Sequence, residues 1–407
     1  MDQVKKNASI QNDAGGSPAI NGSLAYKLPH DFIGNTGIGE CMIKTSDSIS
    51  INSGIDEILV FARNNQTTDI HISANNPIFF RKYGLLTPQT KQCLKKEDVK
   101  KFIESMLSEQ QLTEFYAYGD LELIYVITGA GRFRVTVAKK TPGWDLTIRL
   151  IPMRLFSFQE SGMPESCREL TNWSQGMVLV TGPIGCGKTT TLSVLTELIN
   201  QTRTEHIISI ENPIEFVFQP KKCQITQREI NKHTLSQDNA LRAALRQDPD
   251  ILIVSELRDN ESIQLAATAA ETGHLVLGTM NTNDAAQTIL RIVNSFSPED
   301  RSLVQNMISE SLRGIICQQL IPRKDGRGIV TAYEVLVVNS AISNLIRKGN
   351  VDQILRVIAT GAAEGMIPFD LSLMNLLDKG IISWEEAYAR CSNKREFEKR
   401  RDGLYPF

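Results

Sequence analysis

The sequence VLVTGPIGCGKTTT, residues 178–191, predicts how the larger part of this chain folds. Its apolar, largely β-branched start is typical of a buried strand, and the apolar run breaks at Gly182. After Gly187, leucines recur at helical spacing, so we expect a strand, a loop and a helix in that order. The loop carries the pattern G-x-x-x-x-G-K-[ST], which ends in Lys188 and Thr189.

This pattern is typical of loops that bind the phosphates of a nucleotide. Glycine lets the main chain approach a phosphate closely and adopt conformations that other residues rarely take. The Lys188 ammonium would reach the β- and γ-phosphates, and the Thr189 hydroxyl would hold Mg²⁺. The start of the helix would add partial positive charge. The alternative is a plain strand-to-helix turn.

Composition limits the class of protein. The chain has 407 residues, enough for two domains, and its 41% hydrophobic and 22% charged residues are typical of a soluble globular protein. A net charge of −2 gives no reason to expect nucleic acid as the main partner. The seven cysteines occur without C-x-x-C pairs, which indicates reduced thiols in a cytoplasmic protein. Neither a signal peptide nor a membrane span is predicted.

Changes in sequence pattern divide the chain into three parts. Residues 1–50 are rich in Ser, Asn and Gly without a sustained period, and we expect a mobile arm. Residues 51–155 combine helical spacing with alternating strands, which predicts a small α+β domain with an antiparallel sheet. After a connector that contains Pro152 and Pro164, residues 165–407 alternate strand and helix, as a parallel sheet requires, and end in short helices.

Three arginines are expected on one face of the sheet in the first domain. In the segment GRFRVTV, Arg132 and Arg134 alternate with apolar residues, and Arg149 belongs to the strand that we expect beside it. Planar, permanently charged guanidinium groups suit recognition of a terminal phosphate. The alternative is a solvated face, on which one or more of these arginines pairs with Glu122 or Asp145.

Acidic residues follow two other predicted strands of the second domain. Glu211 ends the run IISIE, and Glu256 follows the run ILIVS. Ligands of a parallel sheet bind outside the carboxyl ends of its strands, so both acids are expected beside the glycine-rich loop. Glu256 is a candidate for Mg²⁺ and its bound water, and Glu211 for activating the water that attacks the γ-phosphate. The alternative for each is a helix-capping or surface acid.

Four ordered segments resemble a family of ATPases. GPIGCGKTT, IENPIEF, LRQDPDILIVSELRD and AAETGHLVLGTMNTNDA resemble the Walker A, Asp box, Walker B and His box of secretion-superfamily ATPases, in particular the PilT-like branch that retracts type IV pili. The resemblance covers about residues 55–390. It implies an α/β chain in which a RecA-like P-loop ATPase domain follows a small PAS-like α+β domain and precedes short C-terminal helices.

The resemblance also implies roles for individual residues. It implies that ATP and Mg²⁺ bind, with Thr189 and Glu256 at the metal. Catalytic roles would fall to the Asp-box, Walker-B and His-box residues and to the arginines of the first domain, namely Glu211, Glu256, His274, Arg132, Arg134 and Arg149. The nucleotide would lie against Gly182, Pro183, Ile184, Gly185, Cys186, Gly187, Lys188, Thr189 and Thr190.

For the whole protein, the resemblance implies a homohexameric motor that converts ATP hydrolysis into mechanical work on a type IV pilus, in retraction and twitching motility. Such a motor would be cytoplasmic and peripheral at the inner membrane, with a pilus or secretion platform protein and a paralogous ATPase as possible partners. The alternatives are an accessory or regulatory pilus ATPase and an ATPase of a related type II, type IV or conjugation machine. A nucleic-acid motor is disfavoured, because no basic, aromatic-rich groove segment is found.

Several positions depart from the PilT-like pattern. Asn281 stands where that branch usually has a second histidine, and Ser343 replaces an arginine near the end of the resemblance. Both changes keep open a regulatory subunit that binds ATP and barely hydrolyses it. Ile184 and Cys186 also differ from the commoner residues, but a loop that binds through its main chain does not need those side chains. The four-cysteine zinc module of assembly ATPases is absent from the sequence, which favours the retraction branch.

Overall fold

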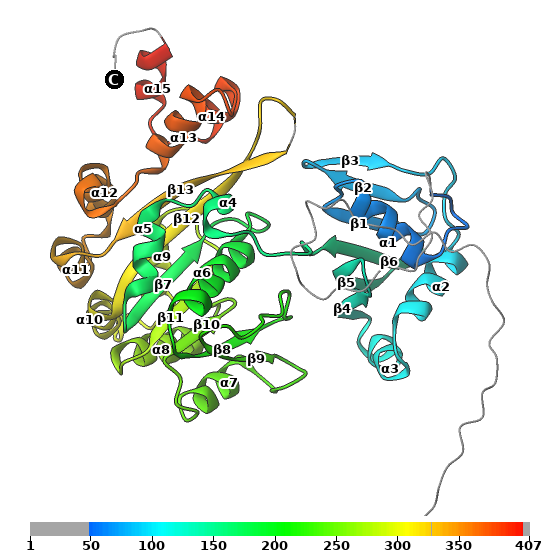
Figure 1. Ribbon diagram of the computed structural model, residues 1–407, viewed down its shortest axis with the longest axis horizontal. Coiled ribbons are helices and arrows are strands. Elements are labelled where there is room, and N and C mark those ends of the chain that lie inside the picture. Colours follow the sequence, from blue (N-terminus) through cyan, green and yellow to red (C-terminus); the bar gives the residue numbers. More distant parts are fainter. Residues whose placement is uncertain (1–48, 327, 402–407) are drawn as a thin grey trace, which may run out of the picture.

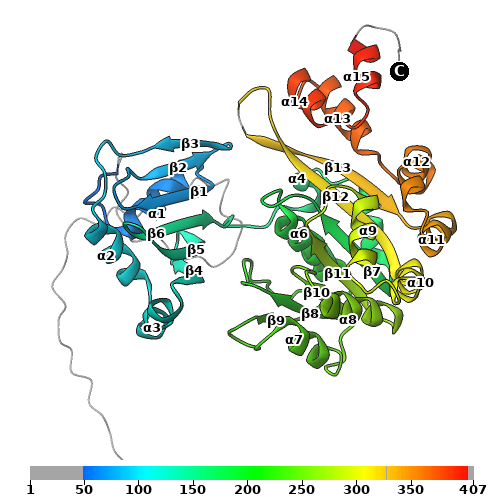
Figure 2. The same ribbon diagram turned by 180° about the vertical axis from the view of Figure 1, so that it is seen from behind.

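The computed structural model describes residues 49–326 and 328–401 and contains two sheets, joined by a connector (Figure 1). The arm expected at residues 1–50 lies almost entirely outside the described residues. Figure 2 shows from behind that the first sheet and the second lie side by side, with the C-terminal helices beyond the second. The segment 178–191, which carries the G-x-x-x-x-G-K-[ST] pattern, begins in a strand of the second sheet.

The first sheet has six antiparallel strands in the order β3-β2-β1-β6-β5-β4. The elements of this part, in chain order, are α1 (Ile55–Asn64), β1 (Asp69–Ser73), β2 (Phe79–Lys82), β3 (Leu85–Pro88), α2 (Lys96–Met106), α3 (Glu109–Tyr118), β4 (Asp120–Ile127), β5 (Gly131–Lys140) and β6 (Gly143–Leu150).

Alternation along the strands separates a core face from a polar face. Phe133 and Val135 of β5 are buried in the core that α1 and α2 also line, whereas the intervening Arg132 and Arg134 are only half-buried. Arg149 of β6 lies directly opposite Arg134 in the strand register. The three arginines therefore share one sheet face, as the alternating pattern predicts.

One half-buried arginine, Arg63, ties α1 to the end of this domain. The Arg63 guanidinium donates to the carbonyl oxygens of Ala130 at 3.1 Å, Arg132 at 3.0 Å and Ile151 at 2.5 Å. It also lies over the Phe133 ring, 4.7 Å from the ring centre. Burial lowers the pKa of Arg63 to about 10. Arg63 thus joins α1, the strand β5 and the first residue of the connector.

The second sheet has seven strands in the order β13-β12-β7-β11-β10-β8-β9, all parallel except β13. Its elements are α4 (Phe158–Ser161), α5 (Glu165–Glu169), β7 (Gly176–Thr181), α6 (Lys188–Thr202), β8 (His206–Glu211), β9 (Gln224–Glu229), α7 (Gln237–Ala244), β10 (Ile251–Val254), α8 (Asn260–Glu271), β11 (Leu275–Met280), α9 (Ala285–Asn294), α10 (Arg301–Ser311), β12 (Leu312–Pro322) and β13 (Ile329–Val337).

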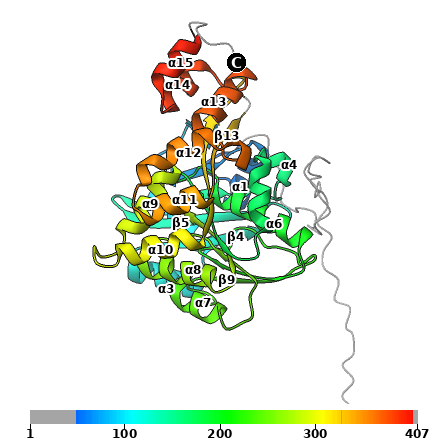
Figure 3. The ribbon, with the colours of Figure 1, turned by 90° about the vertical axis from the view of Figure 1, so that its left-hand side faces the viewer.

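Helices cover both faces of this sheet, so its central strands are apolar throughout. In β10, Ile251 and Ile253 pack in the core with α6, whereas Leu252 and Val254 pack in the core with α7, α8 and α9. Figure 3 shows α8, α9 and α10 along the side of the sheet away from α4 and α6. This double burial explains why the run ILIV was recognisable as a strand.

Short helices follow the second sheet, as expected for the last part of residues 165–407. They are α11 (Ser340–Arg347), α12 (Ile354–Thr360), α13 (Phe369–Asp378), α14 (Trp384–Arg390) and α15 (Lys394–Arg401). The last three form a separate small core against Ile321 and Ala332, near the free end of the β12–β13 hairpin. Among the described residues, no helix is both long and apolar enough to cross a membrane.

The sequence analysis did not identify five strands, β2, β3, β9, β12 and β13. β3 and β9 are edge strands with no fully buried residue, so their sequences lack an apolar period. In β12 a register shift between Leu312 and Gly314 interrupts regular alternation. β12 lies beside β7 and reaches the nucleotide-binding loop, so this strand matters to the site.

Candidate functional site

The glycine-rich loop leaves the middle of the second sheet. β7 lies between β11 and β12, both parallel to it, and all six of its residues are buried. The strand ends at Thr181 and α6 begins at Lys188, so residues 182–187 form the loop. The observed order is the expected strand, loop and helix, and the loop lies at the carboxyl edge of the sheet, where ligands of such sheets bind.

Three glycines give the loop its shape. Gly182, Gly185 and Gly187 have φ angles of 147°, 79° and 90°, which residues with a side chain rarely adopt. A Cβ atom on Gly182 would lie 2.3 Å from the carbonyl oxygen of Gln318 on β12. The Gln318 side-chain amide in turn donates to the Cys186 carbonyl at 2.7 Å. The loop is therefore held against β12.

The Lys188 ammonium points back into the loop. Its Nζ donates to the carbonyl oxygens of Gly182 and Pro183, both at 2.9 Å. Burial lowers the pKa of Lys188, while the charge of Glu256 acts in the opposite direction. The Lys188 ammonium thus lies inside the loop formed by residues 182–187, and phosphate oxygens could replace the two carbonyl oxygens as its hydrogen-bond acceptors.

Glu211 lies at the end of β8 and faces the start of α6. Together with Thr189, Ser255 and apolar neighbours, it lines a cavity of about 10 Å³, which is room for one water molecule. Its Oε1 accepts hydrogen bonds from Ser209 at 2.7 Å and Gln227 at 2.9 Å. Burial raises the pKa of Glu211, and these two donors oppose that shift.

Glu256 follows β10, and two donors hold its carboxylate. Asn281 Nδ2 donates to Oε1 at 2.5 Å, and the Arg258 guanidinium binds Oε2 at 2.6 Å. The Walker-B strand β10 and the Walker-A strand β7 are parallel and separated only by β11, so their carboxyl ends lie at the same sheet edge, and the charge of Glu256 raises the pKa of Lys188 there. Both predicted acids therefore lie at the same sheet edge as the loop.

The structure does not bring His274 to this edge. His274 lies just before β11, and its carbonyl accepts a hydrogen bond from Gly176, the first residue of β7. Its Nδ1 lies 2.9 Å from the Ala269 carbonyl. The six-residue β11 separates it from the loop edge by roughly 16 Å. Within one chain, His274 therefore stands at the opposite end of the sheet from the nucleotide-binding loop.

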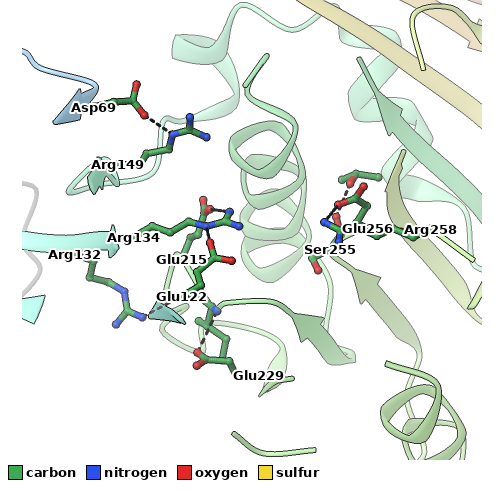
Figure 4. A network of polar contacts seen from close by, with 12 residues as sticks. Asp69, Glu122, Arg132, Arg134, Arg149, Glu215, Glu229, Ser255, Glu256 and Arg258 are labelled. Atoms are coloured by element: carbon green, nitrogen blue, oxygen red, sulfur yellow. Dashed lines mark hydrogen bonds and ion pairs between the residues drawn. The ribbon is translucent and has the colours of Figure 1, made fainter. Parts of the chain in front are cut away.

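Two arginines of the first domain, Arg132 and Arg134, contact the Asp-box segment IENPIEF of the same chain (Figure 4). Arg132 donates to the Ile214 carbonyl at 2.7 Å. Arg134 pairs with Glu122 on the neighbouring strand and with Glu215 at 3.2 Å. The surface pairing considered for Arg134 and Glu122 is thus present, but it extends to the second domain.

Arg149 has a different partner from those considered. Its Nε donates to Asp69 on β1 at 2.8 Å, and its side chain is 51% exposed. Its charge lies near enough to Glu215 to lower the pKa of that carboxyl, against a larger rise caused by burial. Arg132 and Arg134 therefore contact the Asp-box segment, whereas the recorded contact of Arg149 is with Asp69 inside the first domain.

Several residues of the site could not be identified from motifs. Gln227 lies on an edge strand that the sequence did not show, and its amide links Glu211 to the main chain of Phe216 and Phe218. Gln318 belongs to β12, far along the chain from the loop that it supports. Their partners come from distant strands, so only the topology reveals them.

The residues present fit a nucleotide with Mg²⁺. The glycines of the loop leave space beside the main chain that Cβ atoms would otherwise fill. The Lys188 ammonium and the first turn of α6 face this loop and could bind phosphate. In the described part of the chain, no cluster of three His, Cys, Asp or Glu side chains could hold a metal ion unaided. Mg²⁺ commonly binds through one or two protein oxygens together with substrate phosphates and water, and Thr189 and Glu256 could supply such oxygens.

The fold and this site define a P-loop ATPase. The chain belongs to the family described as "Type II/IV secretion system protein", whose model matches residues 44–368. Within that family it is a PilT-like ATPase, as the four motifs indicated, and the expected α/β fold is confirmed.

Individual relatives support this placement. The chain is 40% identical over 343 residues to the type IV pilus retractation ATPase PilT of Pseudomonas aeruginosa, covering 84% of this chain and 99% of that protein. It is 43% identical over 297 residues to a twitching motility protein of Neisseria gonorrhoeae, covering 73% and 79%. The crystal structure of the pilus retraction motor PilT with bound ADP matches with a TM-score of 0.75 and 36% identity, covering 86% of this chain and 100% of that one.

Replacing Gly182 with alanine should weaken nucleotide binding. The new Cβ would lie 2.3 Å from the Gln318 carbonyl and 2.5 Å from Cys186 Sγ, at a φ of +147° that alanine avoids. We expect the affinity for a fluorescent ADP analogue to fall by roughly tenfold or more, about 1.4 kcal/mol. Gly54→Ala is the control, because a Cβ there meets nothing within 4 Å. Equal affinities for the two variants would contradict this view of the loop.

Proposed function

We propose that this chain is an ATP-hydrolysing motor that performs mechanical work on a type IV pilus, in retraction. The observation that carries the proposal is the convergence of the P-loop with Glu211 and Glu256 at one sheet edge, in a chain with extensive similarity to a pilus retraction motor. The first domain, which contacts this edge, supplies the moving part.

In this proposal the loop residues 182–190 bind the triphosphate. Lys188 exchanges its two carbonyl partners for phosphate oxygens, and main-chain N–H groups surround the anion. Thr189 and Glu256 hold Mg²⁺, directly or through bound water, and the ion neutralises charge that develops on the phosphates.

Glu211 is the proposed base for the attacking water. Burial raises the pKa of its carboxyl, which brings the group closer to the range in which a base is effective near neutral pH. Ser209 and Gln227 both bind its Oε1, so they fix the carboxylate in one orientation. The small cavity beside Glu211 and Thr189 has room for one water molecule.

We further propose that the protein works as a homohexameric ring, in which Arg132, Arg134 and Arg149 act on ATP. In the single chain Arg132 and Arg134 already bind the loop that follows Glu211, and Arg149 lies on the same sheet face, so a small rotation of the first domain would change their distance from a bound nucleotide. Guanidinium groups can stabilise charge on the γ-phosphate through paired hydrogen bonds. His274, which lies remote from the loop of its own chain, would then act at a neighbouring subunit.

The proposed cellular place is the cytoplasmic side of the inner membrane, on a platform protein of the pilus or of a secretion machine. This rests on similarity to pilus motors. A second candidate is an accessory or regulatory ATPase that works beside an active paralogue. The observations that favour it are Asn281 and Ser343, which replace residues usual in the PilT-like branch.

Two substitutions test the ATPase proposal. Lys188→Ala should abolish turnover, because the phosphates lose their central cation. Glu256→Gln should keep ATP binding yet hydrolyse on the order of 100-fold more slowly. Release of phosphate and binding of a fluorescent ATP analogue measure the two effects. Wild-type turnover no faster than that of Glu256→Gln would contradict an active motor and support the regulatory candidate.

A ring should be visible in solution. Closed rings suit an arginine face and a P-loop that lie in separate domains, because each subunit can then complete the site of the next. We expect light scattering with Mg²⁺ and ATP, at micromolar protein, to give six times the mass of one chain. A monomer with and without nucleotide would count against this part of the proposal.

The arginine face can be tested one residue at a time. If Arg132, Arg134 and Arg149 act on the γ-phosphate, each alanine variant should lose more than about twofold in ATPase rate, over 0.4 kcal/mol. Lys101→Ala is the matched control, because it removes a positive charge from an exposed helix of the same domain. Rates within twofold for all three variants would confine nucleotide chemistry to the second domain.

A further inference from the structure

Asn281 occupies a distinctive place at the candidate site. It is the first residue after β11, the strand that lies between the P-loop strand β7 and the Walker-B strand β10. Arg291 of α9 donates to its main-chain carbonyl at 3.0 Å. The backbone at this position is therefore held independently of the side chain.

The Asn281 side chain binds Glu256. Its Nδ2 donates to Glu256 Oε1 at 2.5 Å, across the boundary between the two strands. Gln237 holds the main-chain carbonyl of Glu256 at 2.9 Å, and the Leu257 N–H donates to the Thr279 carbonyl at 2.9 Å. The main chain of the Walker-B turn is thus fixed by its own hydrogen bonds. The orientation of the Glu256 carboxylate is therefore set by its two side-chain partners, Asn281 and Arg258.

The two donors to this carboxylate differ in kind. Arg258 binds Oε2 through a side chain that is 71% exposed, on a carboxylate that is only 23% exposed. The exposed Arg258 side chain can release Glu256 when a cation and phosphates bind, because water can replace the carboxylate as its partner at little cost in free energy. The Asn281 amide is neutral and arises from the end of a buried strand, so it would stay in place.

We propose that Asn281 is the positioning residue of Glu256: its amide fixes Oε1 so that Oε2 faces the nucleotide and metal once Arg258 withdraws. This inference rests on the proposed role of Glu256 in hydrolysis. A neutral donor orients the carboxylate without neutralising it. Unlike a histidine at the same place, it also has no proton to gain or lose near neutral pH.

The first experiment separates orientation from binding. In full-length protein, Asn281→Ala should lower kcat by about tenfold or more, because a carboxylate loses a hydrogen bond of the stronger, charged kind. The KM for ATP should stay within twofold, since the loop and Lys188 hold the phosphates. Asn294→Ala, on an exposed position of α9, is the matched control and should leave kcat unchanged.

A double-mutant cycle then tests whether Asn281 acts through Glu256. In the Glu256→Gln background, Asn281→Ala should cause little further loss, because the carboxylate that it positions is gone. Equal losses in both backgrounds would show a general structural effect and overturn the inference. If Glu256→Gln alone has wild-type kcat, the proposed role of Glu256 fails as well, so the two failures are distinguishable.

Asn281→Asp adds a second readout, since aspartate has nearly the same shape as asparagine but, as a carboxylate, offers Glu256 Oε1 no N–H donor. It should therefore lower kcat at least as much as Asn281→Ala does, whereas a role in packing alone would leave kcat near the wild-type value. Wild-type kcat for both variants would overturn the inference.

Discussion

The complete burial of β7 is the constraint on which the site depends. A strand with parallel neighbours on both sides and helices on both faces has no freedom to shift, so the loop after Thr181 begins at a fixed point. The contact of Gly182 with the Gln318 carbonyl fixes its first turn as well. The two acids Glu211 and Glu256 reach this point from the carboxyl ends of β8 and β10.

Polar groups at this sheet edge satisfy one another. Lys188 binds two loop carbonyls, Glu211 accepts two side-chain donors and Glu256 binds an amide and a guanidinium. Buried or half-buried charges need such partners, because an unpaired charge in a protein interior is costly. Binding a nucleotide with its metal is therefore an exchange of partners.

The sequence predicts those parts of this fold in which apolar and polar residues follow a regular local period. The run ILIV before Glu256 signals a doubly buried strand, and alternation in β5 placed Arg132 and Arg134 on one face. The sequence does not predict contacts that depend on the order of the strands in the sheet. The resemblance to the His box implied His274 as a site residue, but His274 precedes β11 and Asn281 follows it, so within one chain the strand puts them at opposite edges of the sheet. Likewise, only the packing of the domains shows that Arg134 contacts Glu215.

The Arg63 contacts have a mechanical consequence. Because this side chain binds the Ile151 carbonyl, the stiff body of the first domain extends to the start of the connector. On the other side, Ser157 caps α4, so the second body begins there. Residues 152–156 are left as the covalent pivot between them. This connector is short, and Arg134 contacts Glu215 close to it. A small rotation of the first domain about the connector would therefore move β3, at the far edge of the first sheet, further than it moves the residues at the contact.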